Sequence, residues 1–313
     1  CCRFGANGEL GWSKTCFSPG VGRIFGTEIR MDRERVPWWL WPNLLSLDAP
    51  LVAVAWAWMF SRAWGVVSLP WELWVTLGVS VWMIYAMDRL VDVRREKNTE
   101  SLDKRHEFHH KFQGVFFAGM IAGLGWGVYS VLWALSQNVL FYGGFVVLMT
   151  VGYFVISLTR SGAEHTGVTK NLMAGLTFAY GTAAGVHAYS PVFSFSQMLL
   201  SWEVLLFAGL CAINMTAIDF WELEGEDEED AAAILGTATL LIGGAAMYFS
   251  LNGDDFNKPL FYSVLVGAAG LNILNRMRAR LDRDSRRLWV DLVILLPVFT
   301  YWVWISFDGN SST

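Results

Sequence analysis

Residues 71–92 read WELWVTLGVSVWMIYAMDRLVD, and this stretch combines the two features that decide the fold. Residues 73–87 carry no charge, and ~20 mostly apolar residues suffice to cross a bilayer as an α-helix. Asp88 and Asp92 follow, four residues apart, so on a continuing helix both project from one face, one turn apart. The stretch therefore predicts a membrane-spanning helix whose end carries two carboxylates.

The composition of the whole chain points the same way. Of 313 residues, 54% are hydrophobic and only 16% are charged, whereas soluble domains carry roughly 25% charged residues. The 17 Trp and 30 Gly are typical of helices that meet lipid at aromatic belts and pack through small residues. A formal net charge of -5 argues against a nucleic-acid partner. We expect an all-α, polytopic membrane protein in contact with membrane lipid.

Apolar stretches of similar length recur from Leu44 onward. They predict nine spans, near 49–68, 71–92, 113–135, 139–159, 171–190, 197–219, 233–251, 259–276 and 288–307. Residues 43–313 would then form a nine-helix membrane domain, and residues 1–42 a Gly-rich, basic tail. Met31 is a candidate start, which predicts that the first 30 residues are dispensable.

The distribution of basic residues predicts the orientation. With nine spans, the tail and the loops after spans 2, 4, 6 and 8 share one side and hold 21 of the 23 Lys and Arg residues. Only Arg62 and Lys258 fall on the other side. Because basic loops stay in the cytosol, we expect a cytosolic N-terminus, cytosolic acidic motifs and a C-terminus on the opposite side.

A second acidic cluster follows span 6. Asp219, Glu222 and Glu226 have the spacing 0, 3, 7, which predicts one helical face until Gly225 loosens it. The remaining acids to Asp230 predict a solvated loop. Oxygen ligands at such spacing suit Mg²⁺ that also binds substrate phosphates. An alternative for both clusters is a helix end whose acids pair with nearby arginines.

Acidic motifs after spans 2 and 6 resemble those of the UbiA superfamily of intramembrane prenyltransferases. The family's first motif, Asn-Asp-x-x-Asp-x-x-x-Asp, falls on Ile84, Tyr85, Asp88 and Asp92, so only its last two Asp are kept. The second motif keeps its spacing at Asp219, Glu222 and Glu226. The stretches Leu44–Pro50 and Lys170–Leu172 are also similar to the family. The resemblance covers about residues 43–307.

This resemblance implies a helical barrel that transfers an isoprenyl group from its diphosphate to a lipophilic acceptor, aromatic acceptors included. It implies that the five acids named above hold Mg²⁺, with Asp88, Asp92, Asp219 and Glu222 acting in catalysis. The implied substrate-binding residues comprise three cations for phosphate and three tyrosines for the allylic cation: Lys170, Arg94, Arg105, Tyr85, Tyr153 and Tyr180. The incomplete first motif leaves an alternative, a catalytically silent membrane subunit or a lipid- or pigment-binding scaffold within a larger complex.

The histidines near residue 106 suggest a different chemistry. His106, His109 and His110 resemble part of a membrane di-iron histidine box, but such sites need about eight His ligands and the chain has five. Zinc bound by His109 or His110 with one acid stays open as an alternative. A basic helix end near lipid headgroups is the simpler interpretation.

Overall fold

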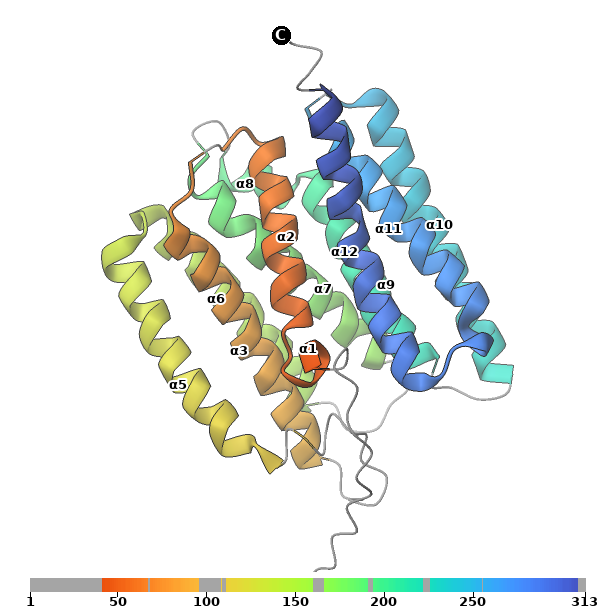
Figure 1. Cartoon of the computed structure of the whole chain (residues 1–313), viewed down its shortest axis with the longest axis horizontal. Coiled ribbons are helices and arrows are strands. Elements are labelled where there is room, and N and C mark those ends of the chain that lie inside the picture. Colours follow the sequence, from red (N-terminus) through yellow and green to blue (C-terminus); the bar gives the residue numbers. More distant parts are fainter. Residues whose placement is uncertain are drawn as a thin grey trace, which may run out of the picture. The chain divides into compact units, whose positions relative to one another are not determined.

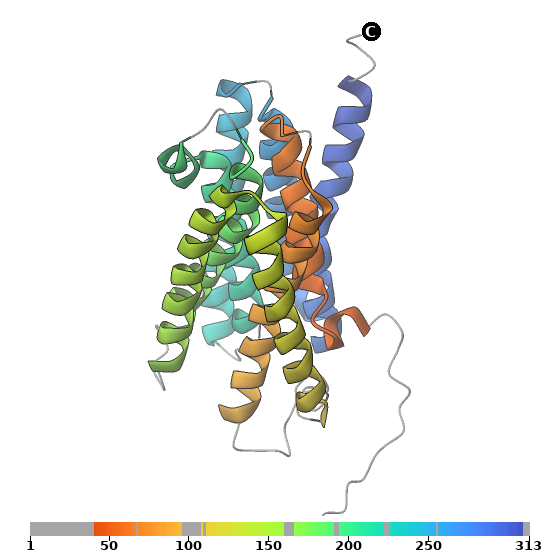
Figure 2. The same cartoon turned by 90° about the vertical axis from the view of Figure 1, so that its left-hand side faces the viewer.

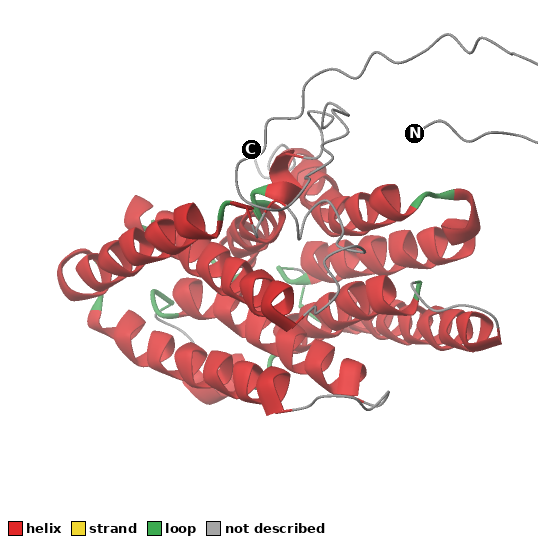
Figure 3. Cartoon of the chain, turned by 90° about the horizontal axis from the view of Figure 1, so that it is seen from below, coloured by secondary structure: helices red, strands yellow, loops and turns green. Residues whose placement is uncertain are grey.

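The computed structural model describes residues 41–66, 68–95, 108, 111–159, 166–190, 194–221, 226–254 and 256–308. Over these ranges the chain is helical and contains no strand (Figure 3). The long helices run alongside one another (Figures 1 and 2). They belong to one compact unit, Trp38–Thr313. Residues 1–40 of the predicted tail lie outside the described residues, so the tail stays a prediction there, whereas its last two residues are helical.

Each predicted span coincides with a helix or helix pair. The elements are α1 (Trp41–Leu44), α2 (Asp48–Ala63), α3 (Trp71–Arg95), α5 (Gln113–Tyr129), the π-helix η3 (Ser130–Ala134), α6 (Gln137–Thr159), α7 (Thr166–His187), α8 (Phe195–Leu199), α9 (Trp202–Phe220), α10 (Glu226–Asn252), α11 (Lys258–Met277), the 3₁₀-helix η4 (Arg278–Arg280) and α12 (Arg283–Asp308). Helices prevail because a chain in lipid must satisfy its backbone hydrogen bonds within each segment.

Six helical segments of the described chain are long and apolar enough to cross a membrane. They are Gln113–Ala134, Gln137–Leu158, Phe195–Phe220, Asp227–Asn252, Lys258–Arg280 and Ser285–Phe307. The chain is therefore a helical, multi-pass membrane protein by the length and composition of its helices. The other long helices differ in kind: α2 has 16 residues, while α3 and α7 carry several polar side chains.

The core lies where α2, α7 and α9 meet. Trp56 of α2 stacks on Phe207 of α9 with ring centroids 4.0 Å apart, and its indole Nε1 donates to the Ile294 carbonyl of α12, 2.9 Å away. Gly175 lets α7 approach α9 closely, since a Cβ there would lie 2.7 Å from the Ala208 carbonyl oxygen. These contacts fix α7, which carries Lys170 and Asn171, against α9, which carries Asp219.

The predicted acidic face and loop after span 6 are wrong in part. Helix α9 ends at Phe220, and α10 already begins at Glu226, so Asp219 and Glu226 belong to different helices rather than to one face. Glu226–Asp230 are helical instead of forming a loop. Acidic side chains in a first helical turn are favoured by the helix dipole, which explains why this run starts α10. Glu222 lies outside the described residues.

Candidate functional site

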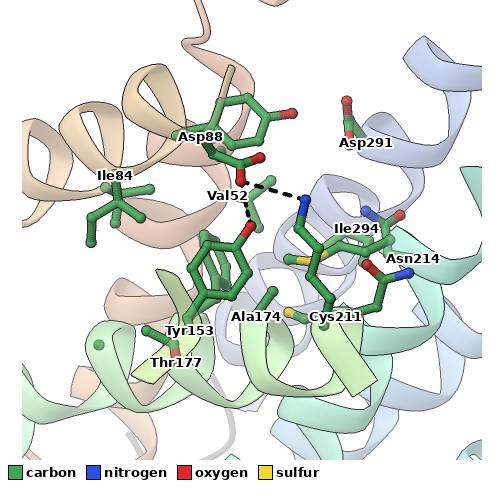
Figure 4. A pocket seen from close by; sticks show the side chains of 18 of the residues that line it. Val52, Ile84, Asp88, Tyr153, Ala174, Thr177, Cys211, Asn214, Asp291 and Ile294 are labelled. Carbon is green, nitrogen blue, oxygen red and sulfur yellow. Dashed lines mark hydrogen bonds and ion pairs between the residues drawn. The ribbon is translucent and has the colours of Figure 1, made fainter. Parts of the chain in front are cut away.

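A cavity of about 270 Å³ opens between α2, α3, α6, α7, α9 and α12 (Figure 4). Three carboxylates line it, Asp88 of α3, Asp219 of α9 and Asp291 of α12. Apolar side chains make up most of the remaining wall, including Val52, Leu77, Val81, Ile84, Val146, Phe178, Met215, Ile218 and Ile294. The cavity therefore combines several charged side chains with an apolar wall, and ligand sites commonly pair a few polar groups with apolar lining.

Asp88 is held by two side chains from different helices. The Tyr153 hydroxyl of α6 donates to Asp88 Oδ1 at 2.5 Å, and Lys170 Nζ of α7 lies 3.6 Å from the same oxygen. Lys170 Nζ also lies 5.9 Å from the centre of the Tyr153 ring. Figure 4 shows both contacts converging on this carboxylate. The structure thus brings together three residues that the sequence assigned to the site.

Asp219 is held by an amide. Asn171 Nδ2 donates to Asp219 Oδ2 at 2.7 Å and lies 3.4 Å from the Thr216 hydroxyl. Asn171 directly follows Lys170, so consecutive residues at the start of α7 contact the acids of both motifs. The sequence resemblance includes Lys170-Asn171 but assigns no role to Asn171. Its position beside a proposed phosphate-binding Lys is the signal that could have found it.

An arginine and a tyrosine stand beside Asp88 on α3. The Arg89 guanidinium donates to the Tyr85 hydroxyl and lies 4.5 Å from the centre of its ring. Both side chains line the cavity. Tyr85, which the resemblance assigned to substrate binding, therefore lines the cavity, and Arg89 adds a cation that the sequence suggested only as a partner for the acids.

Asp291 is a cavity residue that the sequence analysis missed. It lies inside the last apolar segment, Ser285–Phe307, and it lines the cavity with Asp88 and Asp219. An ionisable residue inside a membrane-spanning segment signals a functional position, so this signal was present in the sequence. Arg287, one turn earlier on α12, interacts electrostatically with Asp291 and Arg89.

Of the other predicted site residues, one lies away from the cavity and the rest have side chains outside the described part of the chain. Tyr180 is not among its lining residues, and its hydroxyl donates to the Leu199 carbonyl, 2.6 Å away. Asp92, Arg94 and Glu226 are helical, but their side chains lie outside the description. Predicted residues outside the described ranges altogether are Arg105, Glu222 and the histidines His106, His109 and His110.

The acids of this cavity fit Mg²⁺ only together with a phosphate ligand. Within the described ranges, no three His, Cys, Asp or Glu side chains gather closely enough to hold a metal by themselves. Mg²⁺, however, commonly binds through one or two carboxylates together with substrate phosphate oxygens. Asp88 and Asp219 line one cavity and could supply those carboxylates.

Comparisons with known proteins yielded no relative. No protein-family model matches the chain, and neither a curated protein nor a solved structure matches it. The interpretation of the cavity therefore depends on its own residues and on the placement of the two acidic motifs.

Proposed function

We propose that the protein transfers an isoprenyl group from its diphosphate to a lipophilic acceptor, in a Mg²⁺-dependent reaction within a nine-span, UbiA-like helical barrel. One observation carries the proposal. Asp88 and Asp219 come from acidic motifs about 130 residues apart, yet both line the same cavity. An independent pair of helix-end acids has no reason to share a cavity, whereas a diphosphate site requires it.

The cavity supplies the groups that such a reaction needs. Bound Mg²⁺ supplies charge neutralisation for the departing diphosphate. Asp88 and Asp219 hold the metal, and Lys170 and Arg89 bind diphosphate oxygens. The apolar wall takes the start of the isoprenyl chain, and the rings of Tyr85 and Tyr153 face the developing allylic cation.

The proposed step is a substitution at C1 of the isoprenyl chain. The bond between C1 of the isoprenyl chain and the bridging oxygen breaks, and its electron pair leaves with the diphosphate. The acceptor supplies the electron pair of the new bond to C1. Its proton passes to the released diphosphate. Water must stay out because it would compete for C1, and the apolar lining serves this exclusion.

A catalytically silent membrane subunit is the second candidate, and one contact favours it. Lys170 Nζ lies 3.6 Å from Asp88 Oδ1, so the charge of this carboxylate is already balanced without a metal. Ile84 and Tyr85 line the cavity where the resembling motif has Asn and Asp. A lipid or pigment could fill such a cavity without reacting, in a complex with other membrane proteins.

Binding of geranylgeranyl diphosphate to the detergent-purified full chain separates the two candidates. The titration is made with Mg²⁺ and repeated with EDTA, and geranylgeraniol serves as the control that lacks the diphosphate. Tight binding that needs both Mg²⁺ and the diphosphate supports prenyl transfer. Equal binding of the alcohol and the diphosphate, unaffected by EDTA, supports the silent subunit.

A further inference from the structure

Helices α3 and α7 approach each other at both ends of the cavity. At the charged end, Lys170 Nζ of α7 lies 3.6 Å from Asp88 Oδ1 of α3. At the other end, a Cβ on Gly185 of α7 would lie 3.1 Å from Leu73 Cδ1 of α3, and Leu73 is 4% exposed. The two contacts are 15 residues apart along each helix, or about 22 Å. The helices therefore run antiparallel in register, with the cavity between the two contacts.

The cavity extends along this helix pair as a channel. Away from the charged end, its last lining residue on α3 is Leu77, which lies 11 residues from Asp88. The last lining residue on α7 is Gly181, which lies 11 residues from Lys170. At 1.5 Å per residue, each helix gives the channel a length of about 16 Å. Figure 4 shows Ile84, one turn from Asp88 in this direction, on the cavity wall.

The far end of the channel is narrowed by a third helix. A Cβ on Gly181 would lie 3.4 Å from Val146 Cγ1 of α6, so a side chain larger than hydrogen at this position would occupy the end of the channel. One turn further along α3 and α7, Leu73 lies against Gly185. An extended chain that enters from the charged end therefore meets the Leu73 side chain as an end wall.

We propose that this channel limits the length of the isoprenyl chain to about three units, the length of a farnesyl group. Each unit adds four carbon–carbon bonds of about 1.5 Å, and thus about 5 Å of extended length. Three units match the length of the channel, and the Leu73 side chain blocks a fourth. The absence of a side chain at Gly181 leaves room for the third unit. The role as a substrate channel rests on the proposed prenyl transfer, whereas the length limit applies to any extended apolar chain that enters.

The test titrates a series of diphosphates of increasing length into the detergent-purified full chain in Mg²⁺. The probes are dimethylallyl, geranyl, farnesyl and geranylgeranyl diphosphate, with protein-free micelles as the partition baseline. Each unit up to farnesyl should tighten binding about tenfold, because it buries further apolar surface. Geranylgeranyl diphosphate should bind no more tightly than farnesyl diphosphate. A further tenfold gain at geranylgeranyl would overturn the proposal and show that the chain leaves the cavity sideways between helices.

Gly181→Leu should shorten the channel. We expect farnesyl diphosphate to bind about tenfold more weakly, close to the affinity of geranyl diphosphate, while dimethylallyl diphosphate stays within about twofold of its wild-type affinity. The matched control is Gly144→Leu on α6, where the glycine is exposed and a Cβ would meet nothing within 4 Å. An equal loss for all four probes, or no loss for any, would contradict the role of Gly181.

Leu73→Ala should lengthen the channel and change the preference in the opposite direction. Geranylgeranyl diphosphate should then bind about tenfold more tightly than farnesyl diphosphate, because the end wall is removed. Leu260→Ala is the control, since Leu260 is equally buried on α11 but does not line the cavity. A loss of stability alone does not favour the longer chain. A limit that stays at farnesyl in Leu73→Ala would contradict the assignment of the end wall.

The corresponding alcohols keep the two proposals apart. Geraniol, farnesol and geranylgeraniol are titrated in the same way. A limit at farnesol without any diphosphate binding supports the channel and rejects prenyl transfer. Diphosphate binding that needs Mg²⁺ but still tightens from farnesyl to geranylgeranyl supports prenyl transfer and rejects the length limit.

Discussion

Asp88 and Asp219 belong to two different acidic motifs and line one cavity, but the groups that hold them differ. Asp88 accepts from the Tyr153 hydroxyl and lies beside the Lys170 ammonium. Asp219 accepts from the neutral Asn171 amide. An amide orients a carboxylate without cancelling its charge, whereas a cation does both. Of the contacts described, a metal at Asp88 would meet the Lys170 ammonium, whereas a metal at Asp219 would meet the Asn171 amide.

The largest expected effect comes from removing either carboxylate. Asp88→Ala and Asp219→Ala should each weaken Mg²⁺-dependent binding of geranylgeranyl diphosphate by about 100-fold, or roughly 2.8 kcal/mol. Each variant loses an anionic oxygen that the metal needs. The measurement is the same titration on folded, membrane-inserted protein.

Asp254→Ala is the control for these variants, since this acid follows α10 and is not among the residues that line the cavity. Unchanged diphosphate affinity in both cavity variants would remove the metal assignment. Loss in Asp219→Ala alone would show that Lys170 keeps Asp88 out of the metal site.

A larger side chain at Gly175 should push α7 away from α9. Because Lys170 and Asn171 of α7 contact Asp88 and Asp219, this shift would disturb both contacts. A Cβ at this position would lie 2.7 Å from the Ala208 carbonyl oxygen and the Ala212 amide nitrogen. Gly175→Ala therefore has to push α7 from α9, and we expect a loss of about 1–3 kcal/mol in stability. Thermal unfolding of the purified protein measures it.

The matched control is Gly244→Ala, because a Cβ there meets nothing within 4 Å. This change should leave stability equal or slightly higher, since Ala is the better helix former. An equal melting temperature for both variants would contradict the close approach of α7 and α9.

The sequence predicted the helices better than it predicted the site. Long apolar runs are set by the thickness of the bilayer, so a single chain suffices to locate them. The glycines of α5 show a limit of such patterns: a Cβ at Gly119 would lie 2.7 Å from Trp82, while one at Gly127 meets nothing within 4 Å. Spacing identifies the helix but does not identify which turn faces a neighbour.

Only some residues of the site could be predicted from the sequence, because the site forms where several helices converge. Asp88 and Asp219 stood out because each belongs to a spaced acidic motif, and both line the cavity. Tyr180 was chosen as an aromatic residue of a span, but its hydroxyl binds the Leu199 carbonyl instead. Asn171 and Asp291 each carried a signal in the sequence, but the helices they face are set by long-range packing, which spacing does not encode.

Removing the amide at Asp219 should have an intermediate effect. Asn171→Leu eliminates the 2.7 Å hydrogen bond to Asp219 but keeps the carboxylate. We expect diphosphate binding in Mg²⁺ to weaken about tenfold, because a hydrogen bond to a charged group contributes roughly 1.5–3 kcal/mol. Asn138→Leu is the control, since Asn138 donates to the Ala188 carbonyl away from the cavity lining. Equal affinities for the two variants would show that Asp219 needs no orienting amide.

The smallest expected effect is that of Tyr153→Phe. It removes the hydroxyl that donates to Asp88 at 2.5 Å but keeps the ring beside Lys170. Because Lys170 still holds Asp88 from the other side, we expect only about a threefold loss in diphosphate affinity. The Mg²⁺ titration measures this loss, and Tyr248→Phe on exposed α10 surface is the control. A loss as large as that of Asp88→Ala would show that the phenol, and not the ion pair, is what positions Asp88.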